Sequence, residues 1–332
     1  MQIDPILRVS LNSLLNMDYR PLVSVMIPFH NAAGTLQRCL NSVLALSYRP
    51  LEIILVDDAS TDGGADMIKA YIEENKDLNL RIRILTHAVN KGVAAARDLA
   101  LSEAEGEYIT AVDADDFIDP QAIDEYVKAT DGGRADIVAA GVVYEYEGRQ
   151  VLKSFKRGER LTLDEVRIDS LHFLLTNKLM RTRLLRSVTP FIPGQNCWED
   201  LGAVSRMLAI GAETVVLSDA FYHYVQENEG SLTGSDPDKI LHQHIAVAAS
   251  LEDWLSRRGL AGRNSQFLTY LKFIAKVKWL RNPAELRRHP IRRLRSWRDT
   301  FQEVNAHIMG LRKVKLRYRL IFKTAHILSR FV

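Results

Sequence analysis

The stretch Tyr108-Ile109-Thr110-Ala111-Val112-Asp113-Ala114-Asp115-Asp116 decides the fold class of this chain, because a strand-like run passes directly into an acidic cluster. Three carboxylates this close repel one another, so the cluster persists where a cation or a ligand's hydrogen bonds offset the repulsion. Hard divalent cations such as Mg²⁺ bind one or two carboxylates together with substrate phosphates. The alternative is a solvated acidic turn before Pro120. The position of the cluster at a strand end favours the cation site.

Strand and helix signals alternate through the first 130 residues. The expected strands are 23–27, 52–56, 81–85 and 108–112, and the expected helices are 35–46, 65–74 and 92–103. The run 52–56 is almost continuously apolar, as in a parallel strand covered on both faces. This order predicts an α/β fold: a doubly wound, mostly parallel sheet with helices on both faces.

Polar residues follow each of the four predicted strands. They are Pro28-Phe29-His30-Asn31, then Asp57-Asp58 to Asp62, then His87 to Gly92, then Asp113 to Asp116. In open parallel sheets, ligands bind at the carboxyl ends of the strands. Surface turns alone would not need carboxylates at two separate strand ends, so we expect a binding site at this edge.

The second half of the chain is less regular. Further strands are expected within 137–156, a helix from Leu179 to Arg186, and a helix from Trp198 to Ile210 with Glu199-Asp200 in its first turn. Two separate strands, 215–217 and 221–225, follow. From about Lys239 onward the pattern is helical, with breaks at Gly259, Pro283 and Pro290.

The composition is that of a globular protein of 332 residues with two cysteines, Cys39 and Cys197, which lack metal-ligand spacing. No disulfide framework is expected, so a reducing compartment is the default. The first 17 residues lack the pattern of a signal peptide. No apolar run approaches the roughly 20 residues that span a bilayer. We therefore expect a cytoplasmic protein.

The net charge of +3 is unevenly distributed. Residues 281–332 contain 14 Lys or Arg and three Asp or Glu, a net charge of +11, which leaves −8 for the rest. When residues 311–331 are placed on a helical wheel, one face is apolar and another is basic. The apolar positions are Leu311, Val314, Tyr318, Ile321, Ala325 and Leu328. The basic positions are Arg312, Lys315, Arg319, Lys323 and Arg330. Such helices lie on anionic membrane surfaces. The alternative is a helix packed on the domain with a solvated basic face. No motif accompanies the charge that would indicate specific nucleic-acid binding.

An ordered set of motifs makes the chain similar to the family 2 glycosyltransferases of GT-A fold. The motifs are Val25 to Asn31, Ile54 to Asp62, Asn90-Lys91-Gly92 with Ala96-Arg97, Asp113 to Asp116, Asn177-Lys178-Leu179, Glu199-Asp200, Tyr222-His223-Tyr224 and Ser231-Leu232-Thr233. Each is weak alone, but their order and spacing are specific. The resemblance implies a GT-A domain over 20–235, with a nucleotide-binding half (20–130) and an acceptor half (131–235). A helical basic region follows over 236–332.

The resemblance implies inverting transfer of a sugar from a nucleoside-diphosphate sugar, with UDP favoured, to an acceptor hydroxyl. The acceptor would be a glycan or lipid-linked, as in bacterial surface-polysaccharide synthesis on the cytoplasmic side of the plasma membrane. A divalent metal, Mn²⁺ or Mg²⁺, would hold the diphosphate.

The resemblance also assigns roles to single residues. The expected metal ligands are Asp115 first, then Asp113, with His223 as a further candidate for which a core or surface histidine is the favoured alternative. The residues expected around the nucleotide sugar are Pro28, His30, Asn31, Asp57, Asp58, Lys91, Gly92, Arg97, Asp113 and Ala114. Asp58 is slightly favoured over Asp57 as the residue that binds the nucleobase. Asp116 either belongs to the same acidic site or only caps the next turn.

The pair Glu199-Asp200 is the predicted catalytic pair, with Asp200 as general base and Glu199 orienting it or holding an acceptor hydroxyl. Alternatively, both carboxylates only stabilise the N-terminus of a helix. If the site is apolar, as the adjacent Trp198 suggests, their pKa values should be raised.

Two other functions stay open. A nucleotidyltransferase shares the sheet and the metal, but usually has a Gly-rich phosphate loop where this chain has Pro28-Phe29-His30-Asn31; it would release pyrophosphate. A non-catalytic, membrane-associated scaffold of the same fold would not need the acidic motifs.

Overall fold

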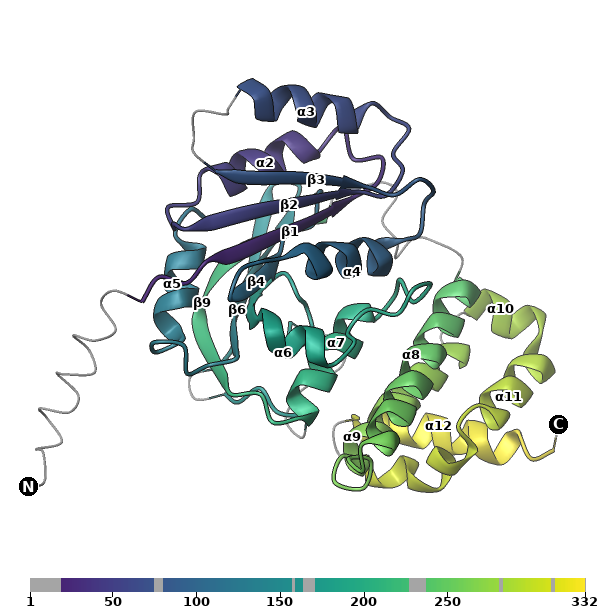
Figure 1. The fold of residues 1–332 in the computed structure, drawn as a ribbon. Helices are drawn as coiled ribbons and strands as arrows, with labels where there is room; N and C mark the ends of the chain where they lie inside the picture. Colours follow the sequence, from purple (N-terminus) through teal and green to yellow (C-terminus); the bar gives the residue numbers. More distant parts are fainter. Residues whose placement is uncertain are drawn as a thin grey trace, which may run out of the picture.

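The computed structural model describes residues 19–74, 80–156, 159–163, 171–226, 237–280, 283–311 and 314–331. They form a nine-stranded sheet covered by helices, followed by a group of helices that contains the described C-terminal end (Figure 1). The strands are β1 (Val23–Phe29), β2 (Leu51–Asp57), β3 (Arg81–Thr86), β4 (Tyr108–Ala111), β5 (Phe117–Ile118), β6 (Ile137–Tyr146), β7 (Arg149–Lys153), β8 (Lys178–Arg181) and β9 (Thr214–Val225).

The helices belong to two groups. Those around the sheet are α2 (Leu36–Leu44), α3 (Gly64–Glu74), α4 (Val93–Glu103), α5 (Ala122–Ala129), α6 (Thr182–Ser187) and α7 (Glu199–Ala209). Those of the C-terminal region are α8 (Pro237–Arg257), α9 (Ser265–Val277), α10 (Pro283–Arg288), α11 (Pro290–Asp299) and α12 (Leu316–Leu328), with short 3₁₀ helices η3 (Lys278–Leu280) and η4 (Gln302–Gly310). Figure 1 shows α2 and α3 on one side of β1, β2 and β3, and α4 on the other.

The strand order is β3-β2-β1-β4-β8-β6-β9-β5, with β7 beside β6. Strands β1 to β4 pair in parallel, and every residue of β1 and β2 is buried. Beyond β4 the sheet is mixed: β8 is antiparallel to β4 and β6, whereas β9 is parallel to β6. The predicted α/β fold with a helical C-terminal region is confirmed, and its parallel part contains the four strands β1 to β4.

Two predicted elements are wrong. The helix expected from Leu179 begins only at Thr182, because residues 178–181 form β8, which is buried between β4 and β6. The two strands expected at 215–217 and 221–225 are one strand, β9. It continues through the exposed polar residues Ser218 and Asp219, and a shift in register against β6 accommodates them.

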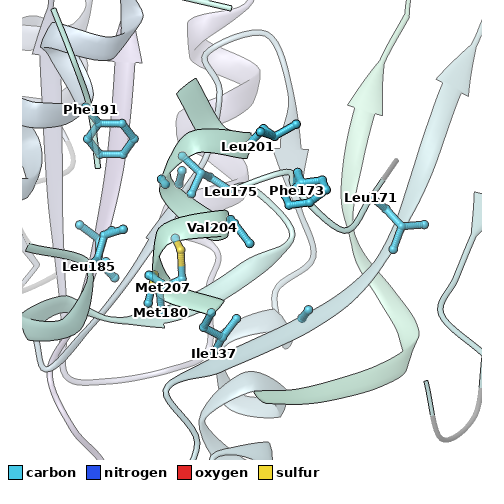
Figure 2. Packing of buried hydrophobic residues seen from close by; sticks show 14 of the residues in the cluster. Ile137, Leu171, Phe173, Leu175, Met180, Leu185, Phe191, Leu201, Val204 and Met207 are labelled. Atoms are coloured by element: carbon cyan, nitrogen blue, oxygen red, sulfur yellow. The ribbon is translucent and has the colours of Figure 1, made fainter. Parts of the chain in front are cut away.

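Helix α7 is fixed to the sheet by an apolar stripe. Leu201, Val204 and Met207 recur at helical spacing and are buried. Figure 2 shows Val204 and Met207 beside Met180 of β8 and Ile137 of β6. Burying each side chain of this kind stabilises the fold by about 1.5–3 kcal/mol. The N-terminal end of α7 is therefore held in a fixed place.

The C-terminal helices follow the predicted breaks. Gly259 has a positive φ of 68° in the turn after α8. Pro283 and Pro290 are the first residues of α10 and α11, where a missing backbone N–H costs nothing. Helix α8 packs against α7, which joins this region to the sheet domain. Among the described residues, the helices are too short or too polar to cross a membrane.

The predicted apolar face of the last helix is only partly buried. Leu311 and Val314 are buried, but Ile321 and Leu328 are more than half exposed. The buried contact of α12 is made instead by Phe322, which meets Phe273 of α9 edge-on with ring centroids 5.1 Å apart. Helix α12 therefore exposes part of its predicted apolar face.

Candidate active site

The carboxyl ends of the four parallel strands bring the predicted residues to one edge of the sheet. The backbone N–H of Asp58 donates to the carbonyl of Phe29 (2.9 Å), and that of His87 donates to the carbonyl of Asp57 (2.9 Å). The N–H of Val112 donates to Met26 (3.0 Å), so the ladder continues to the start of the acidic cluster. As predicted, the loops after β1, β2, β3 and β4 lie side by side.

The loops after β1 and β2 are joined through Asn31. Its side-chain oxygen accepts from the N–H of Thr61 (2.8 Å), and its own N–H donates to Ser60 Oγ (3.0 Å). His30 lies next to it, exposed, with Nε2 3.2 Å from Asn31 Nδ2. Pro28 is buried within β1. His30 and Asn31 therefore border the edge where a nucleotide is expected.

The pair Asp57-Asp58 is buried, and its two members have different partners. Asp58 accepts from His87 Nδ1 (2.7 Å) and from the N–H groups of Lys91 (2.9 Å) and Gly92 (2.6 Å). Burial favours the protonated form, but these hydrogen bonds outweigh it and lower the pKa of Asp58 below its usual value. Asp57 accepts from the N–H of Ser60 (2.8 Å). Asp58 thus anchors the loop after β3, a role that sequence analysis did not assign to it.

Gly92 stands at the start of α4 with a φ of 87°. A Cβ atom there would lie 2.1 Å from Asn196 Nδ2, and Asn196 Oδ1 accepts from the N–H of Ala94 (3.2 Å). The close approach that this glycine permits is therefore made by the chain's own loop before α7. The side chain of Lys91, next to it, is exposed.

The carboxylates of the acidic cluster after β4 have two different environments. Asp116 is buried, accepts from Tyr222 Oη (2.5 Å) and from the N–H of Val225 (2.8 Å), and so ties the loop to β9. Burial, and then the neighbouring Asp113 and Asp115, raise its pKa to about 8. Asp113 and Asp115 are half-buried, with Ala114 buried between them. The two half-buried carboxylates are the candidates for metal binding.

The described residues contain no group of three or more Asp, Glu, His or Cys side chains arranged to hold a metal by themselves. Two carboxylates on one loop still fit Mg²⁺ or Mn²⁺ at a diphosphate, because substrate oxygens and water complete such a coordination shell. The carboxylates of Asp113 and Asp115 are therefore suited to hold a divalent metal ion at a diphosphate.

His223 lies on β9 between two other carboxylates. Its Nδ1 is 2.6 Å from Glu145 Oε1 and its Nε2 is 3.3 Å from Asp119 Oδ1, and the ring stacks on Phe117 with centroids 4.3 Å apart. To ligate a metal, the ring would have to exchange one of these partners. Its role as a metal ligand stays a prediction.

Arg97 connects the acidic cluster to the catalytic candidates. It is buried in α4; Nη2 donates to Asp113 Oδ1 (2.7 Å) and Nη1 to Glu199 Oε1. Both terminal nitrogens are thus committed to carboxylates, which differs from the direct nucleotide contact that the resemblance implied. The guanidinium places Asp113 and Glu199 beside one another.

The predicted catalytic pair occupies the first turn of α7. Glu199 is largely buried, with 10 % of its side chain exposed, and Asp200 Oδ1 accepts from the N–H of Leu201 (2.6 Å). Burial is the main cause that raises the pKa of Glu199 to about 8, against the attraction of Arg97. Burial likewise raises the pKa of Asp200. The predicted direction of the pKa shift agrees with this structure.

Trp198, before the pair, has the left-handed backbone φ of 64°. A bulky residue in that conformation is strained, and such strain clusters at functional sites. Its ring stacks on His244 of α8 with centroids 3.9 Å apart, and Gln243 Oε1 accepts from the N–H of Asn196 (2.8 Å). The C-terminal region therefore supports the loop that precedes the catalytic pair.

Lys178 is a functional candidate that sequence analysis quoted in a motif without assigning a role. It is fully buried, and Nζ donates to the carbonyls of Leu171 (3.0 Å) and Leu174 (2.6 Å) and to Asn177 Oδ1 (2.8 Å). Burial lowers its pKa to about 7, against the attraction of Asp200, which raises it. The feature of the sequence that could have identified Lys178 was the Asn177-Lys178-Leu179 motif. Ser231-Leu232-Thr233, by contrast, lies outside the described residues.

Comparison with known proteins identifies the family of the chain. The family model for glycosyl transferase family 2 matches residues 24–198. The glycosyltransferase GlyG of Streptococcus pneumoniae is 30 % identical over 233 residues, which are 65 % of this chain and 74 % of GlyG. The poly(ribitol-phosphate) beta-N-acetylglucosaminyltransferase TarS of Staphylococcus aureus is 31 % identical over 182 residues, 54 % of this chain and 30 % of TarS.

Two solved structures share the fold. Residues 1–349 of TarS in complex with UDP-GlcNAc superpose with a TM-score of 0.69 at 22 % identity, covering 92 % of this chain and 88 % of that one. The mannosyltransferase PcManGT of Pyrobaculum calidifontis, in complex with GDP-Man and Mn²⁺, gives a TM-score of 0.53 at 15 % identity, covering 98 % and 93 %. Because the family model spans more than half of the chain and the relatives are glycosyltransferases, the chain belongs to glycosyl transferase family 2 and is a glycosyltransferase.

Proposed function

We propose that the protein transfers a sugar, with inversion at the anomeric carbon, from a UDP-sugar to an acceptor hydroxyl in the synthesis of a cell-surface polysaccharide or lipid-linked glycan. The observation that carries this proposal is the Arg97 bridge. One guanidinium contacts both Asp113, in the candidate metal loop, and Glu199, in the candidate catalytic pair. Donor diphosphate and acceptor hydroxyl would then meet at adjacent carboxylates.

The donor nucleotide would lie along the ends of β1, β2 and β4. Asp57 is the better contact for the base, because Asp58 already accepts three hydrogen bonds from its own chain. His30 and Asn31 border the same edge, and the small Ala114 lies between Asp113 and Asp115. The choice of UDP is supported by TarS, whose structures contain UDP-GlcNAc or UDP.

A divalent ion, Mn²⁺ or Mg²⁺, would be held by Asp115 and Asp113, with the donor's diphosphate oxygens as further ligands. Bound there, it would neutralise the charge that develops on the departing diphosphate. The Mn²⁺ in PcManGT supports this cofactor. The exposed Lys91 follows β3 at the same edge of the sheet and would add positive potential there.

Asp200 would act as general base. It accepts the proton of the acceptor hydroxyl while that oxygen bonds to the anomeric carbon, and the bond from this carbon to the diphosphate breaks. Arg97 holds Glu199 beside it, and the positive charge of the buried Lys178 attracts the Asp200 carboxylate. Its raised pKa makes it a stronger base than an exposed aspartate.

The acceptor would be a glycan or lipid-linked saccharide, and the reaction would take place in the cytoplasm at the inner face of the plasma membrane. Two features support this place. Both cysteines are free, as in a reducing compartment. The C-terminal region is strongly basic, and the inner leaflet is anionic.

The test is turnover of a panel of nucleotide sugars with added Mn²⁺ or Mg²⁺, using Asp115→Ala and Asp200→Asn variants. We expect release of UDP and loss of turnover in both variants. Asp253→Asn, an exposed carboxylate on α8 paired with Arg257, is the matched control and should keep full activity. Undiminished transfer by both site variants would remove this assignment, and release of pyrophosphate would indicate a nucleotidyltransferase.

A further inference from the structure

Helix α12 and the residues that follow it expose a set of large apolar side chains. Eleven such side chains are exposed among the residues that the structure describes, and six of them lie between residues 316 and 331. These six, which we call the α12 stripe, are Leu316, Leu320, Ile321, Ile327, Leu328 and Phe331, with exposed fractions of 48 % to 83 %. Soluble proteins rarely expose a contiguous apolar patch without a binding role.

The α12 stripe is held outward by contacts on the opposite side of the helix. Phe322 is buried against Phe273 of α9. Ser329 is also buried, and its carbonyl accepts from Arg298 Nη1 of α11 (3.0 Å). Rotating the helix to bury the stripe would break both contacts. The exposure therefore follows from how α12 packs.

The charged side chains of α12 and of the residues that flank it are all basic. Lys323 and Arg330 are exposed and follow Leu316 by seven and fourteen residues, about two and four helical turns, so they lie along one edge of the stripe. Lys315 is exposed just before the helix. Residues 304–332 contain seven Lys or Arg and no Asp or Glu. The partner should therefore combine an apolar interior with negative charge at its surface.

We propose that the α12 stripe and its basic edge form a surface that binds an anionic lipid membrane. An amphipathic helix of this kind lies in the interface plane, its apolar side chains reaching the acyl boundary and its cations among the headgroups. A second copy of the chain fits less well. Two such faces would bring lysines and arginines together, and residues 304–332 contain no carboxylate to pair with them.

This surface refines the proposed place of the reaction and rests on it only for its biological role. Vesicle binding requires neither donor nor acceptor. A failure of the surface therefore leaves the transfer reaction standing, and a failure of the transfer reaction leaves the surface standing.

The experiment is co-sedimentation of the full chain with vesicles of phosphatidylcholine alone, or of phosphatidylcholine and phosphatidylglycerol in equal parts. We expect binding to the anionic vesicles only, weakened by high salt. Leu320→Glu and Ile327→Glu should each weaken it about tenfold or more, since burial of one such side chain is worth at least that factor. Leu152→Glu, the same change at an exposed leucine of β7, is the matched control and should bind like the wild type.

A second pair of variants keeps the test independent of folding. Lys323→Gln with Arg330→Gln changes only exposed side chains and should weaken binding to anionic vesicles, with the thermal midpoint unchanged. Equal binding of the wild type to both vesicle types, no binding to either, or full binding by Leu320→Glu would overturn the proposal. So would a wild-type dimer in light scattering that Leu320→Glu converts to a monomer, because the occupant would then be a second copy.

Discussion

Two acidic pairs lie at the same edge of this protein, and their surroundings act on them in opposite directions. Asp58 of the first pair is surrounded by N–H donors, which lower its pKa. Glu199 of the second pair is buried with one shared guanidinium, and its pKa is raised to about 8. A carboxylate saturated by its own chain holds structure together. A buried carboxylate whose loss of hydration is only partly offset by its partners is available for proton transfer.

The largest expected effect tests the second pair. Replacing Asp200 by Asn removes the proposed base and should lower kcat by about a thousandfold, within the range that general base catalysis contributes. The KM for the donor should change little, because the donor lies at the strand ends. Steady-state kinetics over donor and acceptor concentrations give both values, and a kcat within tenfold of the wild type would show that the base lies elsewhere.

The next effect tests the first pair through stability. Asp58→Asn should lower the free energy of unfolding by about 3 kcal/mol, because three hydrogen bonds to a buried charge are lost or weakened. Since the pKa of Asp58 is lowered in the folded state, its contribution is present at neutral pH and disappears as the pH falls through that pKa. Urea unfolding at neutral and acidic pH measures both effects. Asp57→Asn is the adjacent control and should cost about a third as much, since it loses one such bond.

A smaller effect tests what connects the second pair to the acidic cluster after β4. Arg97→Gln removes the cation that opposes the raised pKa values of Glu199 and Asp200, so both pKa values should rise further. The base must be deprotonated to act. The acid limb of the kcat/KM profile should therefore move to higher pH.

The control for this shift is Arg83→Gln. Arg83 also bridges two carboxylates, Glu52 and Glu103, but away from the site. Its pH profile should match that of the wild type. An acid limb that stays in place in Arg97→Gln would separate Arg97 from the catalytic pair.

The smallest effect tests whether the second pair depends on the C-terminal region. His244→Ala removes the ring that stacks on Trp198, and kcat should fall about fivefold, the equivalent of one contact worth about 1 kcal/mol. His242→Ala makes the same change two residues away, where the ring faces Trp279 instead. If both variants lose activity equally, the effect is one of general stability.

The parallel half of the fold was predictable, because its strands are apolar runs and each ends in polar residues that a parallel sheet must gather at one edge. The rest depended on contacts distant in sequence. Strand β8 was missed because it is only four residues long and begins with a buried lysine, Lys178, whose hydrogen bonds to backbone carbonyls make burial possible. The partners of Arg97 and Trp198 come from α7 and α8, which no local pattern identifies.

The contact between Gly92 and Asn196 has a consequence for how such enzymes diverge. These residues come from loops about a hundred positions apart, and the gap between them leaves no room for a methyl group. A larger residue at position 92 would also meet a backbone conformation that favours glycine. Among relatives, glycine should therefore persist at position 92 even where position 196 varies, so that the loop before α4 constrains the loop before α7 and not the reverse.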